Sequence, residues 1–86
     1  MQEVINLVEP IVKFARQQIN LLELGQAIAV KLTEHPDYVN QPRLQRIHDK
    51  FASVEDEERF DAFMLDLASW CEYNRCQLVM PGNNKR

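Results

Sequence analysis

The sequence predicts an all-α fold: a small compact bundle of four main helices, some of which can be split further. Only two glycines and four prolines interrupt the 86 residues. No run of period-two alternation is long enough for a strand, and apolar residues recur at helical spacing. With 45% apolar side chains, a chain of this length forms one domain. We expect that domain over residues 1–80 and a flexible tail over residues 81–86.

The first helix is expected from about Gln2 to Gln18. Its apolar side chains cover about half of the circumference, whereas a surface helix needs a stripe of only about 100°. The apolar residues form two rows along the helix, which we call seams. A bundle this small has little interior, so one seam should face the domain and the other a partner protein, in either order. Full burial of the helix is the alternative. Pro10 lies inside the pattern and should bend the helix. The two seams are Val4, Leu7, Ile11 and Phe14, and Ile5, Val8, Val12 and Ile19.

The second helix is expected from Asn20 to about Glu34. The Asn20 side chain can cap it, and Glu23 can reach back to the backbone of Asn20 three residues earlier. Gly25 lies in the middle, where glycine costs about 1 kcal/mol relative to alanine. Its expected use is therefore a close approach to another helix.

The third and fourth helices form a pair that resembles a helix-turn-helix. The third begins near Asn40, with Pro42 tolerated in its first turn. Ser53, followed by Asp56, is a capping signature for the fourth helix, which should end before Pro81. The connecting turn would then be as short as Ala52-Ser53.

The charge distribution argues against binding to nucleic acid. Ten Lys and Arg stand against thirteen Asp and Glu, which gives a net charge of −3. Acidic residues crowd the start of the fourth helix, where they would repel phosphates from a recognition helix. We therefore expect no sequence-specific DNA binding. The basic residues Arg43, Arg46 and Lys50 form either a solvated face or a contact for an acidic patch on a protein partner.

No residue pattern points to catalysis. The chain has no glycine-rich phosphate loop, no Ser or Cys beside a base, and no paired carboxylates on an enclosed face. We expect no enzymatic activity, no cofactor and no metal site. The histidines, His35 and His48, are expected to be ordinary surface residues.

The two cysteines, Cys71 and Cys76, have no histidine or second cysteine pair at ligand spacing, so neither a zinc site nor a disulfide framework is expected. On one continuous helix they would point about 140° apart and could not form a bridge. A reducing compartment fits free thiols. The N-terminal residues carry acids rather than a basic signal sequence, and the longest apolar run is Ala27–Val30, so we expect a cytoplasmic protein with no membrane span.

An ordered series of residues near the N-terminus is characteristic. It consists of Glu3, Val4, Ile5, Leu7, Val8, the run Ile11-Val12-Lys13-Phe14-Ala15-Arg16, and Ile19. Downstream the series continues in Val39-Asn40-Gln41, Leu44, Arg46-Ile47, Phe51, Phe60-Asp61 and Phe63. In this series the chain resembles the AsiA anti-sigma proteins of T-even-like bacteriophages, over roughly residues 3–73. The first helix of that family has no proline, unlike this chain, and residues 71–86 match poorly.

The resemblance implies a function. Members of this family are small all-helical proteins that bind region 4 of the host primary sigma factor, a sigma-70-type subunit of RNA polymerase. Binding blocks recognition of the −35 promoter element, inhibits host transcription and allows a phage activator to redirect the polymerase to middle promoters. Free members form a homodimer through the same apolar face. The contact residues implied here are Glu3, Ile5, Leu7, Ile11, Val12, Phe14 and Ile19.

Two other functions remain open at this point. A small acidic helical inhibitor or adaptor of another host protein, such as a nuclease, would use Glu55, Glu57 and Glu58 to imitate the charge of DNA. A DNA-binding regulator would bind duplex DNA with a steep dependence on salt. We expect no such DNA binding.

Overall fold

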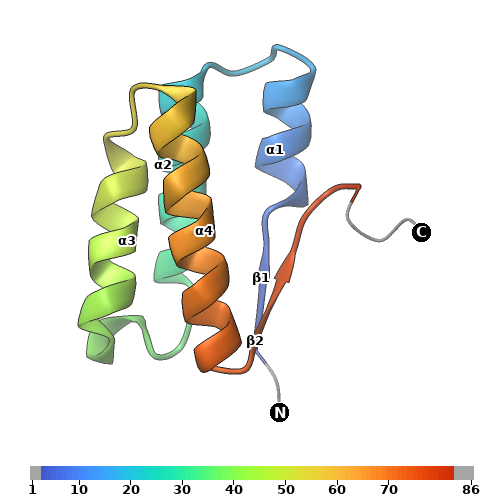
Figure 1. Ribbon diagram of the computed structural model, residues 1–86. Helices are drawn as coiled ribbons and strands as arrows, with labels where there is room; N and C mark the ends of the chain where they lie inside the picture. Colours follow the sequence, from blue (N-terminus) through green and yellow to red (C-terminus); the bar gives the residue numbers. More distant parts are fainter. Residues whose placement is uncertain (1–2, 83–86) are drawn as a thin grey trace.

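The computed structural model describes residues 3–82 as a mostly helical molecule with one short sheet (Figure 1). The helical prediction is confirmed in this coarse sense, but the fold is not purely α. The elements, in chain order, are β1 (Glu3–Asn6), α1 (Val8–Ala15), α2 (Leu21–Thr33), the 3₁₀ turn η1 (Tyr38–Asn40), α3 (Pro42–Ala52), α4 (Glu57–Tyr73) and β2 (Cys76–Val79).

The two strands join the two ends of the chain. β1 and β2 run parallel, with Glu3 opposite Cys76 and Asn6 opposite Val79, and they lie beside each other below α1 in Figure 1. The expectation of a helix from residue 2 and of no strand was therefore wrong. Burial alternates along β1 and just beyond it, because Ile5 and Leu7 are 3% and 0% exposed while the residues between and before them face outward. Four residues are too few for sequence alternation to stand out from a helical pattern.

Pro10 starts a helix rather than bending one. α1 begins at Val8, so Pro10 occupies its first turn, where backbone N–H groups have no partner within the helix. The side-chain oxygen of Asn6 accepts a hydrogen bond from the backbone N–H of Val8 at 2.9 Å and supports this start. The expected kink is absent because the helix is eight residues long and not seventeen.

The start of α2 is as the sequence predicted. The Asn20 side chain accepts a hydrogen bond from the Glu23 backbone N–H at 2.8 Å, and the Glu23 carboxylate accepts one from the Asn20 N–H at 2.9 Å. This capping box satisfies two backbone donors at once. The role expected for Gly25 is also confirmed, because α2 packs closely on α3 at this residue. A Cβ atom built on Gly25 would meet the carbonyl oxygen of Phe51 and a methyl group of Val54.

Gly25→Ala is expected to destabilise the protein by about 2 kcal/mol, although alanine is the better helix former. The backbone carbonyl of Phe51 cannot rotate away from an added methyl group, so α2 and α3 must separate. Urea unfolding followed by circular dichroism measures the change. Gln26→Ala, at an exposed position of the same helix, is the control and should be neutral or slightly stabilising. A stable Gly25→Ala variant would contradict this close approach.

The connection between α3 and α4 is longer than expected. Pro42 stands at the first position of α3, as the sequence indicated. However, the cap of α4 is Asp56, whose side chain accepts a hydrogen bond from the Arg59 N–H at 2.8 Å, and not Ser53. Both residues are good caps, but Val54 is buried at 2% exposure and holds the intervening segment against the core as a loop. α3 and α4 are therefore joined by four residues rather than a two-residue turn.

The core lies among α2, α3, α4 and the start of the chain. Trp70 and Phe51 are its largest fully buried side chains, and the Phe51 ring makes edge-to-face contacts with Phe60 and Phe63 at centroid distances of 5.7 and 5.9 Å. α4 ends at Tyr73, so the fourth helix was predicted too long. Of the expected tail, the structure describes Pro81 and Gly82 as a turn, and residues 83–86 lie outside the described residues.

Candidate partner-binding face

The position of α1 is fixed at both ends. Before it, the Leu7 backbone N–H donates to the carbonyl of Val79 at 2.9 Å, which ties the start of the helix to β2. After it, Gln17 adopts a left-handed backbone with φ of 62°, and Gln18 donates to the Lys13 carbonyl at 2.9 Å. α1 is therefore a short, well-terminated helix held against the bundle by its ends.

α1 carries more apolar surface than the bundle covers. Six of its eight residues are apolar, but only Pro10 is fully buried. Four of the others are half-buried, and we call them the α1 face: Val8, Ile11, Val12 and Phe14. Ile11 and Phe14 pack against the core along one edge, whereas Val8 and Val12 are not part of that packing. The face thus has one side that packs against the core, Ile11 and Phe14, and one side, Val8 and Val12, that is half-buried but lies outside that packing.

The polar side of α1 is small. Glu9 and Lys13 are its only charged residues, and their side chains form an ion pair at 3.6 Å. Both side chains are largely exposed, so this pair contributes little to stability. The charged residues of α1 therefore lie on one side of the helix, at Glu9 and Lys13.

The structure divides the seven residues predicted to contact a partner into two groups. Ile5 and Leu7 lie in the core and leave no surface for a partner. Ile5 points inward from β1, and Leu7 points inward from the residue directly after that strand. Glu3, in β1, and the other four, in or just after α1, remain at least partly exposed. These four are Ile11, Val12, Phe14 and Ile19.

A groove between α1 and α2 was not predicted from the sequence. It has a volume of about 380 Å³ and an apolar lining that includes Pro10, Ile19 and Val30. Charged residues of both signs border it, among them Glu34 and Lys31. Val30, one of its lining residues, is 59% exposed. In the sequence, however, Val30 only ends the apolar run Ala27–Val30, and nothing sets it apart from the other residues of that run.

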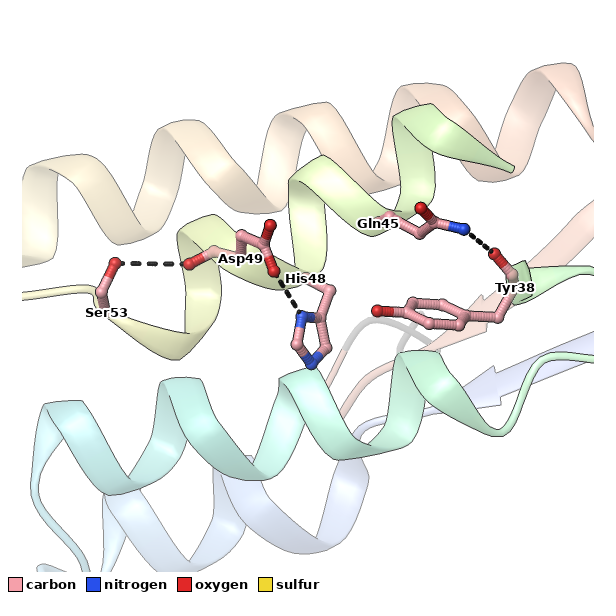
Figure 2. Close-up of polar contacts among 5 residues, drawn as sticks. All are labelled: Tyr38, Gln45, His48, Asp49 and Ser53. Atoms are coloured by element: carbon pink, nitrogen blue, oxygen red, sulfur yellow. Dashed lines mark hydrogen bonds and ion pairs between the residues drawn. The ribbon is translucent and has the colours of Figure 1, made fainter. Parts of the chain in front are cut away.

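The histidines have local partners. His48 lies in α3, where its Nδ1 is 2.9 Å from a carboxylate oxygen of Asp49 and its ring packs edge-on against Tyr38 at 5.6 Å (Figure 2). The Gln45 side chain donates to the Tyr38 carbonyl at 2.8 Å and so links η1 to α3. His35 is buried rather than exposed, because its ring packs edge-on against Trp70 at 5.1 Å.

His35 also has a structural hydrogen bond. Its Nδ1 accepts from the Asp37 backbone N–H at 3.0 Å and so stabilises the turn after α2. The expectation of two surface histidines is thus wrong for this one. Within residues 3–82, no three His, Cys, Asp or Glu side chains gather closely enough to hold a metal ion.

No protein-family model, curated protein or solved structure matches this chain. In the part of the chain that the structure describes, no helix is long and apolar enough to cross a membrane.

Proposed function

We propose that this protein is an anti-sigma factor that binds region 4 of a bacterial primary sigma factor through the α1 face. The observation that carries the proposal is the partly exposed apolar surface of α1, where six of eight residues are apolar and only one is buried. An apolar surface of this kind, with little charge within it, is typical of a protein-binding site. The ordered resemblance of residues 3–73 to the AsiA family supports the choice of partner.

The charges of the two proteins support the same choice. Region 4 holds promoter DNA and is therefore basic, whereas this chain has a net charge of −3. Glu9 lies in the first turn of α1, and Glu3 lies at the other end of β1, opposite Cys76. Charge complementarity of this kind speeds association and favours one orientation of the complex.

The proposed mechanism is occlusion. Apolar side chains of region 4 would cover Val8 and Val12, and the bound protein would prevent region 4 from contacting the −35 element. Promoters that need this element would then be silenced in the host cytoplasm, and a phage activator could recruit the polymerase to middle promoters. In the free protein, the same face of a second copy would cover α1 and give a homodimer.

Transcription with purified RNA polymerase holoenzyme tests this function. We expect the protein to inhibit a promoter that depends on its −35 element and to spare one that does not. A variant with Glu57 and Glu58 replaced by glutamine should inhibit equally, because these exposed residues at the start of α4 lie outside the α1 face. Equal transcription of the −35-dependent promoter with and without the protein would refute the proposal. Loss of inhibition in the glutamine variant alone would instead favour an acidic inhibitor that acts through α4.

A further inference from the structure

The two cysteines lie on either side of a chain reversal. Cys71 is in the last turn of α4, Cys76 is the first residue of β2, and the backbone turns back between them at Asn74 and Arg75. Arg75 adopts a left-handed conformation with φ of 55°. The argument that the thiols point apart assumed one continuous helix, and it fails because α4 ends at Tyr73.

The reversal brings both cysteines into the same part of the core. Cys71 and Cys76 are 3% and 6% exposed and belong to one packed cluster, and both are free thiols. α4 and β2 pack on each other directly. The two cysteines are therefore neighbours in space, one in α4 and one in β2, and only Asn74 and Arg75 connect these two elements.

The thiols also interact with each other. Burial raises the pKa of Cys71 to about 12, and the neighbouring Cys76 contributes to the rise. Burial also raises the pKa of Cys76, and the charge of Glu3 adds to the rise, while the neighbouring Cys71 thiol and the Ile5 backbone act in the opposite direction. The pKa of each thiol is thus raised, and both thiols are poor nucleophiles while they remain buried.

We propose that Cys71 and Cys76 form an intramolecular disulfide when the chain meets a disulfide oxidant such as oxidised glutathione. The Cys76 thiolate attacks one sulfur of oxidised glutathione, which forms a mixed disulfide and releases one glutathione thiolate. The Cys71 thiolate then attacks the Cys76 sulfur of that mixed disulfide, and the second glutathione leaves. Two protein thiols are oxidised, two glutathione molecules are formed from one oxidised glutathione, and the two thiol protons pass to the solvent or the released thiolates.

The bond would tie β2 to the end of α4. β2 holds β1 in parallel register, and the Val79 carbonyl holds the start of α1. Because both thiols are buried, oxidation requires β2 to lift away from α4 for a moment. The reaction should therefore be slow in the native protein but favourable at equilibrium, since the folded chain holds the sulfur atoms together.

Equilibration of the full chain in glutathione redox buffers tests the proposal. The dithiol–disulfide equilibrium is measured by acid quenching and mass spectrometry, with and without guanidinium chloride. We expect a monomer lighter by two hydrogen atoms, and an equilibrium constant about tenfold higher in the native than in the denatured chain. A ratio at or below one would overturn the proposal, because the native fold would then oppose the bond. Disulfide-linked dimers as the main product would overturn it as well.

Thermal unfolding gives a second readout that needs no variant. By linkage, the oxidised chain should unfold at a temperature about 5–10 °C higher than the reduced chain. An unchanged or lower unfolding temperature would contradict the proposal. For the glutathione equilibration, Cys71→Ala is the control variant. It retains Cys76, so its reaction with oxidised glutathione should stop at the mixed disulfide.

Discussion

Leu7→Ala is expected to destabilise the protein by about 3 kcal/mol, one of the largest costs of any single truncation near the N-terminus. The Leu7 side chain is fully buried at the junction of β1 and α1, and its backbone N–H is bonded to Val79. Truncation leaves a cavity where the strand, the helix and the core meet. Urea unfolding gives the free energy of unfolding, and an unchanged m value would show that the transition remains comparable.

Val12→Ala is the matched control for this measurement. Val12 lies in the same segment, but it is only half-buried and is not packed against the core. Its truncation should cost about 0.5 kcal/mol. Equal costs for the two variants would mean that Leu7 is no more enclosed than Val12, as in the single long helix that the sequence pattern first indicated.

Val12→Asp is expected to weaken binding to sigma region 4 by at least about 100-fold while leaving the fold intact. A charge placed in the centre of a dry apolar interface is costly because nothing there can pair with it. In the free monomer, an Asp side chain at this half-buried position can reach water. At a concentration where the unchanged protein is monomeric, the free energy of unfolding should therefore change by less than about 1 kcal/mol. Ile11 and Phe14 are poorer choices for this test because both pack against the core.

Gln26→Asp, at an exposed position of α2, introduces the same charge away from the α1 face. It should bind region 4 about as tightly as the unchanged protein. Isothermal titration calorimetry gives both affinities. If Val12→Asp bound as tightly as Gln26→Asp, the α1 face would not be the site of contact.

The sequence predicted those parts of the fold that depend on local chemistry. Gly25 drew attention because glycine is costly inside a helix, although its contact with Phe51 joins two different helices. The capping residue of α2 and the proline at the start of α3 act through their own backbone or nearest neighbours. A single sequence shows such effects directly, because the physical cause lies within a few residues of its result.

The sequence did not predict the parts that depend on pairing between the two ends of the chain. β1 has four residues, and its apolar positions fit a helix as well as a strand. Its partner, β2, lies about seventy residues away, so no local pattern reveals the pairing. Two signals were present, namely Asn6, which can support a helix start, and Pro10, which fits best in a first turn.

The candidate site was predicted in part. The excess of apolar residues near the N-terminus drew attention to α1, where the half-buried side chains of the α1 face lie. The predicted helix covered too many residues, because it joined the strand β1 and the helix α1 into one element. Ile5 and Leu7 were thereby counted as contact residues although they belong to the core.

Hydrogen–deuterium exchange of the protein with and without isolated region 4 of a primary sigma factor tests the central claim most directly. The account predicts slower exchange on complex formation in residues 8–15, with little change in residues 42–52 of α3. Absence of a complex at micromolar concentrations, or protection confined to the start of α4, would contradict it.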